Sequence, residues 1–282
     1  MNITIIGGDS RIEELVKYLK QDNNEIFLYG IEKSEKLAHF KNEKNMESAI
    51  KDSNLIITSI PLSKDGKYIN TPLSSNKILV QEFFELVKNK KIITGNVTSE
   101  IQKYINFENN IEIIDVLKFE ELTVLNSIPT AEGAIQIAME KSNITIHNSK
   151  CLVLGFGRIG KILAKMLLGI GAEVYCEARK VEDIAWIQAY GYNAIHLNQL
   201  NNFLGEFDFI FNTIPFLILD KNNLKLVKKQ AILIDLASKP GGIDFEEANK
   251  LNLENYWALA LPGKVAPKTA AKYIYESIKK CM

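Results

Sequence analysis

The chain has 282 residues, enough for two domains of ordinary size. Lys and Arg together number 34, and so do Asp and Glu, so no excess of positive charge favours nucleic acid or an anionic membrane as partner. No apolar run is long enough to span a bilayer, and the N-terminal residues predict a strand and a turn, not a signal peptide. We therefore expect a soluble protein of the cytoplasm.

The three cysteines, Cys151, Cys176 and Cys281, have no spacing typical of metal ligands. Cys151 and Cys176 fall inside predicted buried strands, where a thiol behaves as a small apolar group. We expect no metal site and a reducing environment.

The two halves of the chain follow the same order of elements. Each has an apolar strand with a Gly-rich exit, then a strand that ends at Ile-Pro, then a strand with a polar exit. The matching pairs are 3–8 with 151–157, 54–62 with 207–216, and 91–97 with 231–238. Continuous apolar strands that alternate with helical segments indicate parallel sheets covered on both faces. The prediction is an α/β protein with two doubly wound, Rossmann-like domains, a cleft between them, and ligands at the carboxyl ends of the strands.

Two helices are expected to bridge these domains. One begins near Ile128, with Pro129 in its first turn, and the other follows 264–269 and packs back on the first domain. The predicted N-terminal domain for substrate or partner comprises 1–128 and 267–282. The predicted coenzyme domain comprises 129–266.

The Gly-rich turn of the first half does not have the pattern of a nucleotide site. It reads Gly7-Gly8-Asp9, lacks a third glycine, and carries a carboxylate where a phosphate would lie. Like charges repel at short range, so we expect no dinucleotide there and a helix cap at Asp9.

The turn of the second half, GFGRIG at 155–160, lies where a strand ends and a helix begins, which is the context of a dinucleotide fingerprint. The first glycine permits a tight turn, the second admits a pyrophosphate close to the backbone, and the third permits close packing of helix and strand. The N-terminus of the helix then offers oriented N–H groups to phosphates. The predicted coenzyme ligands here are Gly155, Gly157, Arg158, Ile159 and Gly160.

The end of the next strand bears on the choice between NADP and NAD. An acid at this position accepts hydrogen bonds from the ribose of NAD. Counting along the strand places Ala178 there, followed by Arg179, whose guanidinium suits a 2′-phosphate. This favours NADP over NAD, although a shift of one residue in register would make Glu177 the ribose acid.

Further candidates lie at strand exits and helix starts, where a small-molecule site is expected. Lys264 and Lys268 flank Pro267 at a predicted helix start, so two ammonium groups and free N–H groups could bind a carboxylate. The additional coenzyme candidates are Asn212, Thr213, Pro215, Asp235 and Ala237. The substrate candidates are Ser59, Asn96, Thr130, Lys264, Lys268 and Thr269. The candidates for proton transfer are Glu132, Asp235 and Lys264. The histidines His39, His147 and His196 are scattered, and none is proposed as a general base.

Five segments together give the chain a resemblance to the family of dipicolinate synthase A subunits: 126–139, 155–174, 209–215, 233–245 and 261–274. The resemblance is dense over 126–274 and extends to the first 125 residues only through IIGGDSR and the general layout. More distantly, the plan is similar to that of alanine dehydrogenase and the 2-hydroxyacid dehydrogenases.

The resemblance implies an NADP-dependent oxidoreductase that forms dipicolinate (pyridine-2,6-dicarboxylate) from a dihydrodipicolinate-type precursor of the lysine pathway during sporulation. It implies a partner, the flavoprotein-like B subunit of the synthase, and a location in the cytoplasm of the mother cell. A homo-oligomer is possible. Two alternatives stay open at this point: a nucleotide-binding structural or regulatory subunit of that complex, and an NAD(P)-dependent dehydrogenase of amino or 2-hydroxy acids.

Overall fold

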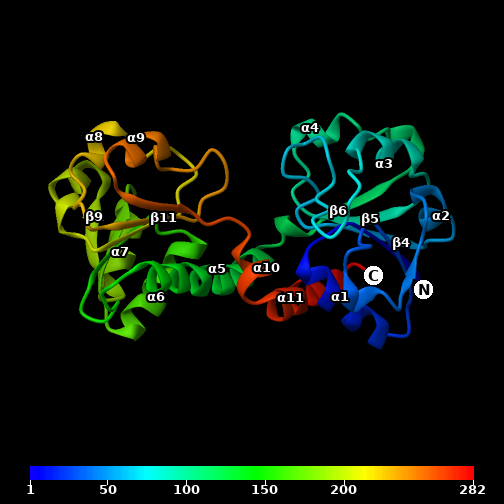
Figure 1. Cartoon of the computed structure of the whole chain (residues 1–282), viewed down its shortest axis with the longest axis horizontal. Helices are drawn as coiled ribbons and strands as arrows, with labels where there is room; N and C mark the ends of the chain where they lie inside the picture. Colours follow the sequence, from blue (N-terminus) through cyan, green and yellow to red (C-terminus); the bar gives the residue numbers. More distant parts are fainter. The chain divides into compact units, whose positions relative to one another are not determined.

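A computed structural model of the protein describes residues 1–282, apart from the side chain of Phe107. The chain forms two compact units (Figure 1). Unit 1 comprises Met1–Leu125 and Ala266–Met282, and unit 2 comprises Asn126–Val265. Both ends of the chain therefore belong to unit 1.

Each unit contains a six-stranded parallel sheet of the same topology. In unit 1 the order is β3-β2-β1-β4-β5-β6, and in unit 2 it is β12-β11-β10-β7-β8-β9. The unit 1 strands are β1 (Asn2–Ile6), β2 (Glu25–Tyr29), β3 (Lys41–Asn42), β4 (Leu55–Thr58), β5 (Lys91–Thr94) and β6 (Glu112–Asp115). The unit 2 strands are β7 (Lys150–Leu154), β8 (Glu173–Ala178), β9 (Asn193–His196), β10 (Phe209–Asn212), β11 (Ile232–Asp235) and β12 (Glu254–Trp257). The predicted fold class, two doubly wound α/β domains, is confirmed.

Helices cover both faces of the unit 1 sheet. Helices α1 (Ser10–Gln21) and α11 (Pro267–Lys279) share one apolar cluster with it, and α2 (Met46–Lys51), α3 (Val80–Leu86) and α4 (Ser99–Gln102) share the other. Short 3₁₀ turns are η1 (Glu35–Leu37), η2 (Phe107–Asn109) and η3 (Val116–Lys118). Helix α11 lies wholly in unit 1, and its packing against α1 confirms that the last helix returns to the first domain.

The unit 2 sheet is covered in the same way. Helices α5 (Glu120–Lys141), α6 (Arg158–Ile170) and α7 (Val181–Ala189) pack on one face. The other face carries the 3₁₀ turns η4 (Leu197–Asn202) and η5 (Leu204–Glu206) with α8 (Lys221–Leu224) and α9 (Phe245–Lys250). Helix α10 (Leu261–Val265) packs against α5 at Gly133, where an added Cβ would lie 3.1 Å from the Cβ of Leu261.

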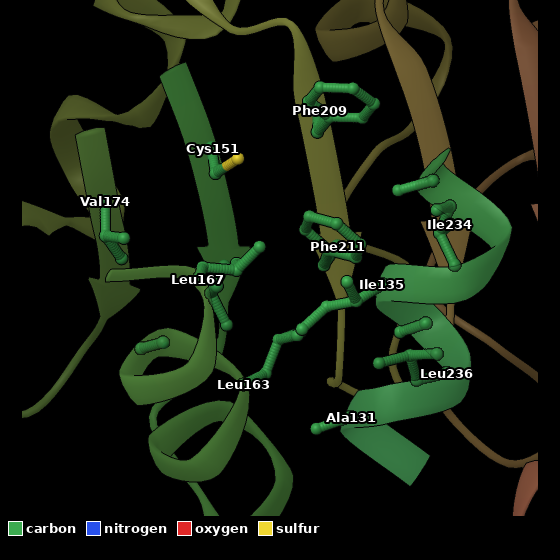
Figure 2. Packing of buried hydrophobic residues seen from close by; sticks show 14 of the residues in the cluster. Ala131, Ile135, Cys151, Leu163, Leu167, Val174, Phe209, Phe211, Ile234 and Leu236 are labelled. Atoms are coloured by element: carbon green, nitrogen blue, oxygen red, sulfur yellow. The ribbon is translucent and has the colours of Figure 1, made fainter. Parts of the chain in front are cut away.

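The core of unit 2 explains why its strands are almost continuously apolar. Figure 2 shows the α5 and α6 side of the sheet, where Phe209 and Phe211 of β10 and Cys151 of β7 face the helices. Burial of the thiol raises the pKa of Cys151 to about 12, so it stays protonated and packs as an apolar group. Both Cys151 and Cys176 are fully buried, as predicted.

The start of α5 differs from the prediction. The helix begins at Glu120, so Pro129 lies inside it and not in its first turn. A proline there removes one helical hydrogen bond, at a cost of about 3 kcal/mol in a helix interior. The Thr130 hydroxyl donates to the carbonyl of Asn126 at 2.8 Å, and Ala131 and Ile135 are buried against the sheet. Tertiary packing therefore keeps the helix continuous through the proline.

Among the described residues, none of the helices combines the length and the apolar composition that a membrane span requires.

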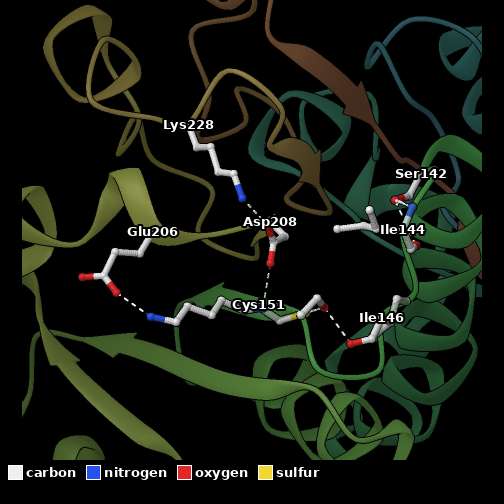
Figure 3. A network of polar contacts seen from close by, with 9 residues as sticks. Ser142, Ile144, Ile146, Cys151, Glu206, Asp208 and Lys228 are labelled. Atoms are coloured by element: carbon white, nitrogen blue, oxygen red, sulfur yellow. Dashed lines mark hydrogen bonds and ion pairs between the residues drawn. The ribbon is translucent and has the colours of Figure 1, made fainter.

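A polar network joins Lys150, the first residue of β7, to Asp208, which directly precedes β10, at the edge of the sheet opposite the carboxyl ends (Figure 3). The Asp208 carboxylate accepts from the Lys150 N–H at 3.0 Å and from the Lys228 ammonium at 2.5 Å. Burial opposes ionisation of Asp208, but these donors and the positive charges of both lysines outweigh it and lower its pKa. A second ion pair, between Lys150 and Glu206, is more exposed.

We expect Asp208→Asn to destabilise the protein by about 1–3 kcal/mol at neutral pH, because a charged acceptor of two hydrogen bonds is lost. Because the folded-state pKa is lowered, the contribution of Asp208 is present above its ordinary pKa of 3.8 and disappears as pH falls through the lowered value. Urea unfolding at several pH values measures this. The control Glu206→Gln, at the exposed pair, should change stability by less than about 1 kcal/mol. Equal changes in stability for both substitutions would contradict the conclusion that the Asp208 contacts stabilise the fold more than the exposed pair does.

Candidate functional site

The turn that follows β7 has the geometry of a phosphate-binding loop. Gly155 has φ +89°, and an added Cβ would lie 2.7 Å from Thr213 Oγ1. At Gly160 an added Cβ would lie 2.1 Å from the Gly155 carbonyl oxygen, so α6 starts in direct contact with the end of β7. Gly157 is the N-cap of α6, and nothing lies within 4 Å of the position of its Cβ. The first turn of α6 therefore presents N–H groups to an open space.

A cavity of about 620 Å³ opens at this turn, within the size range of small-molecule sites. Its walls come from the carboxyl ends of β7, β8, β9 and β10, all within unit 2. The lining residues are Gly155, Phe156, Gly157, Glu177, Ala178, Arg179, Lys180, Asp183, Leu197, Leu200, Asn201, Ile214, Pro215, Phe216, Leu217, Ile218 and Asn223. Open doubly wound sheets place their ligands at this position.

Glu177 is the buried acid of this cavity. Its side chain is 2 % exposed, and its Oε2 accepts from the Gly155 N–H at 3.2 Å. Burial raises the pKa of Glu177, and this outweighs the hydrogen bond from Gly155 and the nearby charges of His196 and Arg179. The carboxyl group thus lies beside the first glycine of the fingerprint.

The register of β8 determines which residues face the cavity. Strand β8 ends at Ala178, which pairs with His196, and Glu177 pairs with Leu154. Counting along the sequence placed Ala178 at the ribose position, but it is Glu177 that contacts the glycine turn. Arg179 and Lys180 follow directly and line the same cavity. An acid and two cations therefore meet at one wall.

Two large apolar side chains of the cavity are exposed. Phe216 is 77 % exposed and Leu217 57 % exposed, just after Pro215. Exposed apolar groups beside a polar turn are typical of a site that covers them when it is occupied.

Several residues predicted as ligands lie behind the cavity wall instead. Asp235 and Asn212 are fully buried, and Asn212 Nδ2 donates to Asp235 Oδ1 at 2.8 Å. The same carboxylate accepts from the N–H groups of Ala237 at 2.9 Å and Gly242 at 2.7 Å. These bonds occupy Asp235 in the turn after β11, so the structure gives it a structural role and not one in proton transfer. Ala237 is buried as well.

The remaining coenzyme candidates surround the glycine turn. The Thr213 hydroxyl donates to the Leu154 carbonyl at 2.8 Å, which holds the end of β10 against β7. Arg158 is exposed at the start of α6, and Ile159 is half-buried against the core. Of the predicted coenzyme ligands, the structure brings Gly155, Gly157, Arg179 and Pro215 to the cavity wall.

The candidates for substrate binding and proton transfer divide between the two units. In unit 2, Lys264 and the proton-transfer candidate Glu132 are exposed, and the Thr130 hydroxyl is bonded within α5. In unit 1, Asn96, Lys268 and Thr269 are exposed. Because Lys264 and Lys268 belong to different units, their predicted convergence on one carboxylate stays a prediction.

Ser59 does not fit its predicted role in substrate binding. Its side chain is fully buried, and its hydroxyl donates to the Leu62 carbonyl at 2.9 Å. A small polar residue after a strand indicates an accessible exit, but here the hydroxyl satisfies a buried carbonyl of the following turn.

The glycine turn of unit 1 is closed by its own side chains. Asp9 is the N-cap of α1, as predicted, and accepts from the Arg11 backbone N–H at 3.1 Å. The Arg11 guanidinium also pairs with the Asp9 carboxylate at 2.8 Å and donates to the Ile60 carbonyl. Burial opposes ionisation of Asp9, but Arg11 lowers its pKa. An internal ion pair thus occupies the position at which unit 2 presents open N–H groups.

Sequence reasoning missed much of the far wall of the cavity. Two of these residues, Lys180 and Asp183, lie at the start of α7 after β8, and the others follow β9 and β10. The others are Leu197, Leu200, Asn201, Ile214, Phe216, Leu217, Ile218 and Asn223. Strand β9 has only four residues, Asn193–His196, and shows no strong apolar pattern. The signal that the sequence did carry is the apolar pair Phe216-Leu217 directly after Pro215.

The geometry agrees with comparisons to known proteins. The profile of the N-terminal domain of the dipicolinate synthase A subunit matches residues 2–117, and that of the D-isomer specific 2-hydroxyacid dehydrogenase NAD binding domain matches residues 129–241. The A subunit of dipicolinate synthase from Bacillus subtilis (strain 168) is 28% identical over 284 residues, which cover 100% of this chain and 96% of the relative.

Solved structures extend the comparison. The crystal structure of the dipicolinate synthase A subunit from Bacillus halodurans has a TM-score of 0.88 and 29% identity, and the alignment covers 99% of this chain and 97% of that one. An L-alanine dehydrogenase has a TM-score of 0.67 at 14% identity over 100% of this chain and 88% of that one, which shows a shared fold alone.

The fold and the glycine turn define an α/β protein of the class that binds nicotinamide dinucleotides in a Rossmann-like domain. Within this class the chain is homologous over its whole length to the dipicolinate synthase A subunits. The resemblance seen in the sequence is confirmed.

We expect Glu177→Gln to stabilise the protein at neutral pH by about 0.5–2 kcal/mol, because it removes a buried charge and keeps an oxygen that can accept from Gly155. The folded-state pKa of Glu177 is raised above 4.5, so the advantage is present above that raised value and disappears at lower pH, where the wild-type carboxyl is neutral in both states.

Urea or thermal unfolding across pH measures this difference. The control is Glu173→Gln at the exposed start of β8, which should stay within about 0.5 kcal/mol of wild type. Destabilisation by Glu177→Gln at neutral pH would show that local contacts favour the charged carboxylate.

Proposed function

We propose that this chain is an NADP-dependent oxidoreductase that oxidises a dihydrodipicolinate-type precursor to dipicolinate. The observation that carries the proposal is the glycine turn that opens into a cavity beside Arg179, in a full-length homologue of the dipicolinate synthase A subunits. The sequence profile of unit 2, an NAD binding domain, supports a nicotinamide coenzyme.

The residues present fit such a coenzyme. Gly157 leaves room at the N-terminus of α6, where a pyrophosphate would accept from backbone N–H groups. Phe216 and Leu217 offer apolar surface for the adenine ring, and the volume of about 620 Å³ accommodates an adenosine moiety. The protein therefore supplies both a polar and an apolar part of the site.

The proposal of NADP over NAD rests on Arg179 and Lys180. A guanidinium and an ammonium at one wall favour a 2′-phosphate through charge-assisted hydrogen bonds. Glu177 opposes this preference when it is ionised, and its position beside Gly155 makes NAD the second candidate. Burial raises the pKa of Glu177, which weakens that opposition.

The reaction divides into two transfers. The glycine turn would hold the coenzyme, whose nicotinamide would supply the acceptor for a hydride from a ring carbon of the substrate, while a proton would leave the ring to complete the aromatic system. Aromatisation contributes much of the driving force, so the protein mainly has to hold the substrate and exclude water. Glu132 and Lys264 are the proposed groups for the proton, and Asn96, Lys264, Lys268 and Thr269 are the proposed contacts of the two substrate carboxylates.

We further propose that the chain acts in the cytoplasm of a sporulating mother cell, in complex with the flavoprotein-like B subunit of the synthase. The alternative, a nucleotide-binding subunit without catalysis of its own, is tested by the same assay. The purified chain is mixed with NADP and dihydrodipicolinate, with and without that partner, and dipicolinate and NADPH are measured. Turnover by the partner alone at the full rate would contradict the enzymatic role.

We expect Arg179→Ala to weaken binding of NADP by roughly 1.5–3 kcal/mol and binding of NAD little, because only NADP carries the 2′-phosphate. Titration calorimetry with both coenzymes measures this. The matched control is Arg158→Ala, which removes an exposed arginine at the start of α6 and should affect both coenzymes alike. Equal losses of affinity for NADP and NAD in Arg179→Ala would refute the proposed contact between Arg179 and the 2′-phosphate.

We expect Lys264→Met and Lys268→Met each to raise the KM for the substrate about tenfold and to leave the Kd for NADP near that of wild type, because a charge-assisted carboxylate contact is lost. Steady-state kinetics and coenzyme titration measure the two quantities. The control is Lys272→Met, one turn further along α11, where the ammonium pairs with Glu276. Unchanged KM in both variants would remove these lysines from the site.

A further inference from the structure

The imidazole of His196 connects two walls of the cavity in unit 2. Its Nε2 lies 3.1 Å from the backbone carbonyl oxygen of Arg179, and its Nδ1 lies 3.3 Å from the backbone nitrogen of Asn198. The Asn198 N–H is a donor, so Nδ1 must accept, and the ring proton is then on Nε2 and is donated to Arg179. One neutral tautomer satisfies both bonds.

The two connected segments carry different parts of the lining. Arg179 and Lys180 belong to the turn between β8 and α7, and Leu197 and Asn201 belong to η4. His196 itself is the last residue of β9 and pairs with Ala178 across the strands. The ring therefore starts from a fixed point in the sheet and holds both turns where they leave it.

The turn from β8 into α7 has little local support of its own. Lys180 is the N-cap of α7, and its side chain makes no capping hydrogen bond. Arg179 itself is exposed. The bond from His196 thus restrains the peptide group that follows the Arg179 Cα, and a rotation of this group would redirect the guanidinium.

We propose that His196 is a positioning residue that sets coenzyme selectivity by holding the main chain of Arg179. The inference rests on the proposed function, in which Arg179 binds the 2′-phosphate of NADP. A ligand without that phosphate gains nothing from the orientation of the guanidinium. Loss of the His196 bond should therefore weaken NADP binding and leave NAD binding nearly unchanged.

Three substitutions separate the two bonds of the ring. In His196→Asn the new side chain can still cap η4 through its Oδ1, but it is too short to reach the Arg179 carbonyl. His196→Gln places an amide nitrogen at about the reach of the imidazole Nε2, and His196→Ala makes neither bond. The Kd values for NADP and NAD are measured on the full chain by titration calorimetry, together with melting temperatures without coenzyme.

We expect the ratio of NADP to NAD affinity to fall about 3–10-fold in His196→Ala and His196→Asn, the value of one hydrogen bond, and to stay within about twofold in His196→Gln. The control is His147→Asn, because His147 Nδ1 makes a similar contact to the Ile170 carbonyl at 3.0 Å and is not among the lining residues. It should leave the ratio unchanged.

The outcomes distinguish this inference from the proposed function. If wild type binds neither coenzyme, the proposed function fails. If wild type binds NADP but His196→Ala and His196→Asn keep the wild-type ratio, the role of His196 is overturned. Equal losses of affinity for both coenzymes would show a merely structural role, and a lost preference in His196→Gln would show that the hydrogen bond to the Arg179 carbonyl does not set the ratio.

Discussion

The contact between Gly160 and the carbonyl oxygen of Gly155 determines how unit 2 presents its cavity. An added Cβ would lie 2.1 Å from that oxygen, so α6 can begin against the end of β7 only with glycine there. This contact directs the first N–H groups of α6 at the space in front of Gly157. In unit 1 the same topology has an ion pair between Asp9 and Arg11 at the equivalent turn. The same fold thus has a glycine turn that is accessible to an anion in unit 2 and one that is occupied by an internal ion pair in unit 1.

Polar groups behind the cavity wall make the turns rigid. Asp235 accepts from Asn212, Ala237 and Gly242, so it orders the loop after β11 and satisfies three buried donors at once. At the end of β8, the buried Glu177 carboxyl accepts one hydrogen bond from Gly155, and its burial raises its pKa. The two acids therefore differ in their roles. Asp235 orders the loop after β11, whereas Glu177 is a titratable group in the lining of the cavity.

The sequence predicted the strands and the glycine turn well, because both depend on local signals. A continuous apolar run such as β7 has one stable environment, a sheet covered on both faces, and Gly155 and Gly160 are required by backbone geometry. The start of α5 was misplaced because Pro129 is normally a helix-starting signal, and the packing of Ala131 and Ile135 outweighs it. Ser59 and Asp235 were interpreted as accessible because polar residues at strand exits usually are, and their internal hydrogen bonds cannot be seen in sequence.

The order of residues is enough to predict that two parallel sheets repeat one plan and that the second half carries the dinucleotide turn. It also shows that an acid, Glu177, and a cation, Arg179, lie at the end of the same strand. The contact of Glu177 with Gly155 and the bond of His196 to the Arg179 carbonyl are visible only in the folded protein. The reason is physical: side-chain identity and period are local properties of the chain, whereas register, burial and contacts across strands arise only when distant segments pack together.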